Sequence, residues 1–363
     1  MIKISKDSRL YIWISPKEAI SGGAEQLQFL AHTLKKFGVN VKCFNFQYEL
    51  YLERNEYYSK LYDVDGIGSD EIINDENSII LFPDYMIYSA QATEGDLLEF
   101  YKERFSKCQF IFWLMSTSFH DGKKSLRMTY NDFKFFDDKE NTLFACEQEL
   151  GKRDLEYFSG VKHILSLQHG IHEDYYKVPI DLSKKKNIVL YNAFKPGTRE
   201  YVEKLKPYLN DIEFKAITYK GIDKHLSKEE MCDQYDECKV FIDFCEFNGR
   251  ELTPREAVQR NCILYVGNNG DAVYFNEYPI PDYYKINKFD DPQILANKIR
   301  KSFDNYYDEL NNFQIFKNKI RLDTSGFLNT ILMLFKPMIT KNISIYTTLH
   351  NGDIDISYSS FTD

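Results

Sequence analysis

The sequence predicts an α/β protein made of two Rossmann-like domains that face each other across a cleft. Its 363 residues are more than one average domain needs. Short unbroken apolar runs alternate with amphipathic helical stretches, a pattern typical of parallel strands covered on both faces. The alternation stops at a lysine-rich stretch, residues 183–186, and then starts again, which indicates a second domain of the same kind.

The first domain is expected to begin with a strand, a helix and a second strand. The first apolar run is followed by apolar residues with helical spacing, from Leu27 to Phe37. Gly38 is expected to end this helix, because glycine is common just after the last helical residue. The strands predicted for this domain lie at residues 10–14, 39–44, 79–82, 109–114, 142–146 and 163–165.

The second domain repeats the same alternation. Its predicted strands lie at residues 188–191, 213–217, 240–244 and 263–266. We therefore expect an N-terminal domain over residues 1–180, a C-terminal domain over residues 181–325 and a final segment over residues 326–363.

The final segment is expected to contain a helix and a β-hairpin. Residues 343–358 alternate in polarity around Asn351-Gly352, a pair that favours a type I′ turn. An isolated hairpin is only marginally stable, so its apolar face needs a covering surface. That surface is either the protein's own domain or a partner, such as a second subunit or a membrane-bound protein contacted together with the helical stripe 328–335.

The composition excludes several classes of protein. The formal net charge of −9 argues against nucleic acid as the main partner. No apolar run approaches the roughly 20 residues of a transmembrane helix, and none near the N-terminus fits a signal peptide. The seven cysteines form no C-x-x-C pair, which favours reduced, buried thiols. We expect a cytoplasmic protein. If the tail binds a partner, that contact would be with a second subunit or would hold the protein peripherally at the inner face of the membrane.

The densest group of polar residues lies at 246–257, directly after the predicted strand 240–244. It contains Arg250 and Arg255, and guanidinium groups at a strand-to-helix junction suit the binding of phosphate. A structural alternative is a capping box formed by Thr253 and Glu256, in which Glu256 bonds only to backbone at the helix start. The capping box does not account for the arginines.

Two further loops are candidates for ligand contacts. Gly22 and Gly23 lie between the first strand and the first helix, where glycine lets backbone N–H groups approach an anion or a sugar. The alternative for this loop is a plain strand-to-helix turn. His120 follows the strand 109–114, at the carboxyl end where such folds bind ligands. Its imidazole suits general-base work near neutral pH, and the alternative is an exposed loop histidine.

The sequence predicts no metal site. Asp63 and Asp65 form a D-x-D pattern, but they do not follow a clear apolar strand, so we interpret them as part of a solvated loop. His169 and His172 have no third ligand at a fixed spacing, and a loop between the domains is the preferred interpretation.

The segment FIDFCEFNGRELTPREAVQRNCILYVGNNGDA resembles the donor-binding signature of GT-B glycosyltransferases. It is especially similar to bacterial surface-polysaccharide enzymes, such as those of capsule and O-antigen synthesis, that carry a D-F-x-x-x-x-G-x-x-x-x-P-R-E-A pattern. Three other stretches agree in order and position, namely SGGAEQLQFLAHTLKKFGVNV, FWLMS and VLYNAFKPGTREYVEKL. The likeness covers about residues 10–300.

The resemblance implies a GT-B fold and a hexosyl-type glycosyltransferase that needs no metal and no cofactor. The substrates would be a nucleotide-sugar donor, held by the C-terminal domain, and a glycan or lipid-linked acceptor. In such enzymes the glutamate matching Glu256 binds the nucleotide ribose, and a basic residue matching Lys195 neutralises the diphosphate. The complete donor-binding set carried over is Asn192, Lys195, Gly249, Arg250, Thr253, Arg255 and Glu256.

Gly22 and Gly23 would face the acceptor and the donor phosphates, and His120 would be the catalytic base. Many retaining members carry a second glutamate eight residues before the one matching Glu256, where this sequence has Asn248. Retaining and inverting chemistry therefore both stay open. Two alternative functions on the same fold are a nucleotide-sugar epimerase and a non-catalytic protein that binds nucleotide sugars within a polysaccharide assembly complex.

Overall fold

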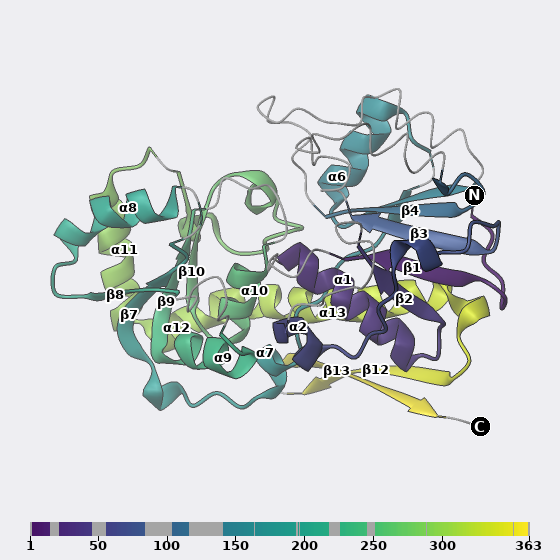
Figure 1. Ribbon diagram of the computed structural model, residues 1–363. Coiled ribbons are helices and arrows are strands. Elements are labelled where there is room, and N and C mark those ends of the chain that lie inside the picture. Colours follow the sequence, from purple (N-terminus) through teal and green to yellow (C-terminus); the bar gives the residue numbers. More distant parts are fainter. Residues whose placement is uncertain are drawn as a thin grey trace. The chain divides into compact units, whose positions relative to one another are not determined.

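The computed structural model divides into two compact units, shown in Figure 1. Unit 1 comprises Met1–His169, Ser325–Thr347 and Ile356–Asp363, and unit 2 comprises Gly170–Thr324 and Thr348–Asp355. The first division falls at His169, against a predicted boundary at residue 180. The structure describes residues 2–14, 22–45, 56–83, 104–115, 141–162, 164–193, 195, 197–217, 226–244, 251–287, 289–350 and 352–361.

Unit 1 is built on a parallel sheet of six strands in the order β2-β1-β3-β4-β5-β6. Each predicted strand of this half is confirmed to within one or two residues. The central strands are buried along their whole length, because helices and loops cover both faces of such a sheet. The strands are β1 (Arg9–Trp13), β2 (Val41–Phe44), β3 (Ser78–Pro83), β4 (Gln109–Leu114), β5 (Thr142–Cys146) and β6 (Ile164–Ser166).

The helices of unit 1 include the predicted first helix. This is α1 (Gly22–Lys36), whose apolar stripe is fully buried, and Gly38 ends it with a φ of 82°, a left-handed conformation that favours glycine. Phe29 of α1 stacks on Phe327, with ring centroids 5.4 Å apart, and Phe327 also stacks on Trp113 of β4 at 6.2 Å. The other α-helices described before residue 169 are α2 (Glu56–Leu61) and α6 (Glu149–Asp154).

Unit 2 is built on a second parallel sheet, with the strand order β11-β10-β9-β7-β8. The four predicted strands are confirmed, and the two-residue strand β11 was not predicted. Because all five strands run in parallel, their carboxyl ends share one edge of the sheet. The strands are β7 (Lys186–Tyr191), β8 (Glu213–Ala216), β9 (Cys238–Asp243), β10 (Ile263–Gly267) and β11 (Lys285–Ile286).

Helices cover both faces of the second sheet (Figure 1). Helices α8 and α11 pack on each other on one face, and α9 and α10 lie against the other, with α7 beside them. The α-helices are α7 (Asp174–Lys177), α8 (Thr198–Leu205), α9 (Lys228–Glu237), α10 (Leu252–Gln259), α11 (Pro292–Asp304), α12 (Tyr306–Glu309) and α13 (Gln314–Leu334), the last of which continues into unit 1.

The C-terminal hairpin is confirmed as β12 (Asn342–His350) and β13 (Asp353–Phe361), with Gly352 at a φ of 85° in its turn. It packs on its own chain. Ile356 is buried, and the ring of Tyr358 meets the ring of Phe37 edge-on at 5.8 Å. The apolar stripe 328–335, offered as part of a partner surface, is largely buried, with Ile331 fully so. These contacts favour the packing alternative for this part of the tail, while Leu349 of β12 is exposed.

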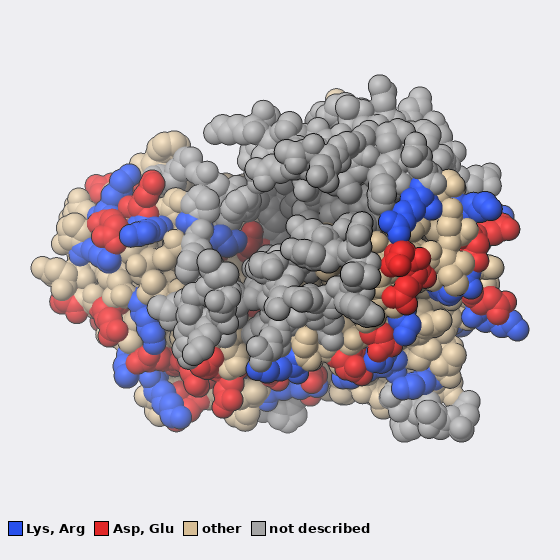
Figure 2. Space-filling model, viewed as in Figure 1, with Lys and Arg blue, Asp and Glu red and all other residues tan. Residues whose placement is uncertain are grey.

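The described surface is mixed in charge. Figure 2 shows lysine and arginine side chains interspersed with aspartate and glutamate over the described residues of the face in view. Among the residues that the structure describes, no helix combines the length and the hydropathy that a membrane span requires. The six described cysteines are free and buried, and burial raises the pKa of the Cys108 and Cys232 thiols to about 12.

The stretch interpreted as a lysine-rich break contains a buried lysine. Lys185 is 7% exposed and directly precedes β7. Its ammonium group donates hydrogen bonds to the backbone carbonyls of Tyr235 (2.7 Å), Cys238 (2.9 Å) and Arg260 (2.6 Å). Three carbonyl dipoles offset the cost of taking this charge out of water. One side chain thus joins the end of α9, the start of β9 and the residue after α10.

We expect Lys185→Met to destabilise the fold, because it removes the hydrogen bonds that the ammonium group donates to three backbone carbonyls. The free energy of unfolding should fall by about 2–4 kcal/mol. Chemical denaturation measures this change, and Lys184→Met is the matched control because Lys184 is exposed and should change stability by less than about 0.5 kcal/mol. Equal effects of the two substitutions would contradict a structural role for the Lys185 ammonium.

Candidate functional site

The candidate site lies at the carboxyl edge of the sheet of unit 2. In the order β11-β10-β9-β7-β8, the direction of winding reverses between β7 and β9. Doubly wound sheets bind their ligands at such a reversal, beyond the carboxyl ends of the strands. Asn192 and Lys195 follow β7, and α10, which carries Thr253 and Glu256, follows β9. The topology therefore brings these four predicted donor-binding residues to one edge.

The loop after β7 is fixed to the end of β9. The Lys195 backbone accepts a hydrogen bond from the N–H of Thr198 at 3.3 Å, and Gly197 allows this turn with a φ of 83°. The hydroxyl of Thr198 is fully buried and accepts a hydrogen bond from the N–H of Phe244 at 3.1 Å. Asn192 is also buried. The backbone that carries Lys195 is therefore held in one place.

The start of α10 is fixed to the same strand end. The Thr253 hydroxyl donates to the carboxylate of Asp243, the last residue of β9, at 3.4 Å. The capping-box alternative is wrong, because the N-cap residue of α10 is Glu251 and Thr253 lies inside the helix. Glu256 consequently does not cap the helix start.

Glu256 lies in the interior of unit 2 and is 4% exposed. One of its carboxylate oxygens accepts a hydrogen bond from the hydroxyl of Tyr235, on α9, at 3.0 Å. Tyr235 is fully buried, so this bond fixes the Glu256 side chain in a dry environment. Sequence reasoning missed Tyr235, which lies 21 residues before its partner and belongs to no motif.

The side chain of Glu251 forms an ion pair with Lys195. It makes no capping bond to α10, although Glu251 is the N-cap residue. The Lys195 side chain is 18% exposed and that of Glu251 is 25% exposed, so water reaches both. No role for Glu251 was predicted from the sequence. The pairing brings the predicted diphosphate ligand directly to the N-terminus of α10.

Arg255, predicted to bind phosphate, and Arg260, at the end of α10, are both buried in structural contacts. Arg255 is 1% exposed and donates to the carboxylate of Asp323, on α13, at 3.1 Å. Arg260 is fully buried, bonds to Asp236 and donates to the carbonyl of Val178 at 2.6 Å. These contacts hold α10 within unit 2, and the assignment of Arg255 to the donor stays a prediction.

Negative charge gathers around the candidate site. Asp243 and Asp271 are buried, at 1% and 2% exposure. Burial raises the pKa of the Tyr278 hydroxyl well above its usual value, and the charges of Glu251, Asp271 and Asp243 raise it further. An anionic ligand at this edge therefore needs a cation, and Lys195 is placed to supply it.

Several predicted residues lie outside the described part of the chain or in unit 1. His120, Gly249 and Arg250 lie outside the described residues. Gly22 and Gly23 form the first turn of α1, directly before the buried part of that helix. This turn follows β1, and in the order β2-β1-β3-β4-β5-β6 the direction of winding reverses between β1 and β3. The turn therefore has the same topological position in the sheet of unit 1 as the loop after β7 has in the sheet of unit 2.

The remaining candidate ligands are engaged in local contacts. Asp63 and Asp65 each pair with Lys35 at 2.9 Å, and Asp65 also pairs with Lys42 at 3.1 Å. Hydrogen bonds from these lysines lower the pKa of Asp65. The imidazole of His169 pairs with Glu147 in unit 1.

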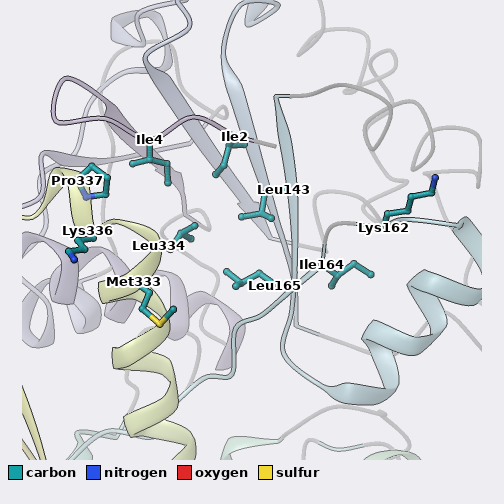
Figure 3. A pocket seen from close by; sticks show the side chains of 10 residues that line it. All are labelled: Ile2, Ile4, Leu143, Lys162, Ile164, Leu165, Met333, Leu334, Lys336 and Pro337. Carbon is teal, nitrogen blue, oxygen red and sulfur yellow. The ribbon is translucent and has the colours of Figure 1, made fainter.

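A cavity of about 650 Å³ in unit 1 lies apart from these residues (Figure 3). Its lining is mainly apolar and includes Ile2, Leu143, Leu165 and Leu334, while Lys162 extends away from it. No predicted site residue lines this cavity.

No family model matches the sequence, and no curated protein matches it. Solved structures do resemble the fold. Sucrose-phosphate synthase from Thermosynechococcus elongatus matches with a TM-score of 0.58 and 10% identity over 90% of this chain and 98% of its own. The trehalose-6-phosphate synthase OtsA matches with a TM-score of 0.58 and 11% identity over 91% of this chain and 99% of its own.

Two further structures add to this likeness. HepE from Anabaena, solved in complex with UDP and glucose, has a TM-score of 0.55 and 9% identity over 90% of this chain and 98% of its own. TarM has a TM-score of 0.52 and 12% identity over 74% of this chain, and the match spans 56% of TarM. The predicted GT-B fold is confirmed by these matches, and identities this low establish the fold alone.

We expect Tyr235→Phe to lower stability through the loss of one hydroxyl. Phenylalanine keeps the ring contacts with Tyr175 and Phe241, but the buried Glu256 carboxylate loses a donor. A hydrogen bond to a charged group contributes about 1.5–3 kcal/mol, and urea denaturation should show a loss of this size. Tyr208→Phe, at an exposed position, is the control. Unchanged stability in Tyr235→Phe would mean that the hydroxyl does not fix Glu256.

Proposed function

We propose that the protein is a glycosyltransferase that moves a hexosyl-type sugar from a nucleotide-sugar donor to a glycan or lipid-linked acceptor in surface polysaccharide synthesis. The observation that carries this proposal is the position of Lys195 and Glu256 at the winding reversal of unit 2. They supply a half-buried ammonium group and a buried carboxylate at the edge where such sheets bind ligands. The bound UDP and glucose of HepE, which shares the fold, support the same chemistry.

Each residue has a role in holding the donor. The Glu256 carboxylate accepts hydrogen bonds from ribose hydroxyls, while the Tyr235 hydroxyl fixes its orientation. The Lys195 ammonium binds the diphosphate, and the backbone N–H groups at the start of α10 add the positive end of a helix dipole. Asn192 and Thr253 complete this wall of the donor site, with Gly249 and Arg250 from the loop before α10.

The reaction breaks the bond between the anomeric carbon and the diphosphate oxygen and forms a bond to an acceptor hydroxyl oxygen. Negative charge then develops on the departing nucleoside diphosphate, where Lys195 and the start of α10 stabilise it. The acceptor hydroxyl must lose its proton, and His120 is the residue we assign as base. The predicted role of Gly22 and Gly23 toward the acceptor and the donor phosphates is part of the same proposal. No metal or cofactor is required by this scheme.

We expect nucleoside diphosphates and their sugar derivatives to raise the melting temperature. A ligand at 100 times its Kd adds about 2.7 kcal/mol of stability, which a thermal-shift screen of UDP, GDP and ADP against the matching nucleosides detects. Lys195→Ala should weaken diphosphate binding about tenfold or more, and should leave nucleoside binding unchanged, because a charge-assisted hydrogen bond contributes about 1.5–3 kcal/mol. Glu256→Gln should weaken nucleoside binding as well.

The exposed Lys204, on α8 of the same unit, provides the matched control, and Lys204→Ala should bind every ligand normally. Diphosphate affinity that survives Lys195→Ala would remove Lys195 from the donor site. Donor binding without transfer to any acceptor would favour a non-catalytic binding protein, and conversion of the donor alone to another nucleotide sugar would favour an epimerase.

We expect transfer activity to survive chelation of divalent metals. The scheme assigns the charge of the diphosphate to Lys195 and the N-terminus of α10, so EDTA should leave the rate of nucleoside diphosphate release unchanged. The measurement follows this release with and without EDTA in the presence of donor and acceptor. Loss of activity that Mn²⁺ or Mg²⁺ restores would contradict this expectation and would direct attention to Asp63 and Asp65.

A further inference from the structure

We propose that Glu251 competes with the diphosphate of the donor for Lys195, so that the ion pair between them is the donor-free arrangement of the site and opens when the donor binds. This inference rests on the proposed function. It assigns Glu251 the role of a residue that sets the affinity for diphosphate by acting through Lys195.

The two residues are brought together by fixed backbone. The hydroxyl of Thr198, three residues after Lys195, bonds to Phe244, and the hydroxyl of Thr253, two residues after Glu251, bonds to Asp243. Both anchors lie at the end of β9. The backbones therefore cannot easily separate, and any opening of the pair must come from rotation of the two long side chains.

The exposure of this pair distinguishes it from the buried pair of Arg255 with Asp323 in the same unit. The side chains of Arg255 and Asp323 are 2% and 8% exposed, so their pair is closed to solvent. Those of Lys195 and Glu251 are 18% and 25% exposed. An ammonium group is a compact charge with three rotatable donors, and it can exchange a carboxylate oxygen for a phosphate oxygen. The Lys195 pair is thus accessible to an anionic ligand, as the Arg255 pair is not.

A diphosphate and the Glu251 carboxylate cannot both approach Lys195 at little cost. Each is negative, and the buried Asp243 and Asp271 already add negative charge to this neighbourhood. Repulsion between like charges is strong where water is partly excluded. When the diphosphate binds Lys195, the Glu251 side chain must therefore turn away toward solvent, and the energy of the broken ion pair is subtracted from the affinity for the donor.

Replacement of Glu251 by glutamine tests this competition. Glutamine keeps the size of the side chain and removes its charge, and no capping bond is lost because Glu251 makes none. A half-exposed ion pair contributes up to about 1 kcal/mol, so Glu251→Gln should bind UDP and inorganic pyrophosphate about fivefold more tightly. Uridine, which has no phosphate, should bind Glu251→Gln and the unchanged protein with equal affinity. Calorimetry at low ionic strength measures all three ligands on the full chain.

Two variants make the measurement specific. In the double variant Lys195→Ala/Glu251→Gln, affinity for pyrophosphate should equal that of Lys195→Ala alone, because the competition acts through the ammonium group. Glu173→Gln breaks the exposed pair of Glu173 with Lys177 in the same unit and should leave all affinities unchanged. Thermal unfolding of each variant without ligand confirms that it is folded.

The outcomes separate this inference from the proposed function. Tighter binding of UDP and pyrophosphate by Glu251→Gln, lost when Lys195 is absent, supports it. If the unchanged protein binds UDP and Lys195→Ala weakens that binding, but Glu251→Gln gives no gain, the competition is refuted and the proposed donor site stands. If neither the unchanged protein nor Glu251→Gln binds UDP, GDP, ADP or pyrophosphate, the proposed donor site and the competition are both wrong.

Discussion

The buried ammonium group of Lys185 is the constraint on which the candidate site of unit 2 depends. It bonds to the carbonyls of Tyr235 and Arg260, and so fixes the end of α9 against the end of α10. Between those two helices the hydroxyl of Tyr235 meets the carboxylate of Glu256. A contact at the amino edge of the sheet thereby holds in place the helix that carries Glu256, the residue that we propose binds the ribose of the donor.

The charged residues of this unit fall into two groups that differ in their access to water. Arg255 and Arg260 are themselves buried, pair with Asp323 and Asp236, and hold α10 in place, so they belong to the framework. Lys195 and Glu251 are partly exposed at the edge where the winding reverses. The cations of one unit thus differ in their access to water.

The sequence predicted the strands well, because an unbroken apolar run is a local signal, as at residues 109–114 and 142–146. The two-residue strand β11 was too short to give such a signal. Contacts between residues far apart in the sequence were not predictable. The partners of Lys185 lie 50 or more residues from it, and Asp323, the partner of Arg255, is 68 residues away. The capping-box alternative at Thr253 failed for a related reason, since the Thr253 hydroxyl bonds to Asp243, ten residues earlier.

The path of the chain through the two units has a consequence for biosynthesis. The stacked rings of Phe29 and Trp113 are completed by Phe327, which is translated after the five strands of the parallel sheet of unit 2. The sheet of unit 1 is therefore made before the sheet of unit 2, but this part of its core closes after that sheet is made. Until Phe327 emerges, apolar surface on the nascent N-terminal sheet remains uncovered and is a natural substrate for chaperones during vectorial synthesis.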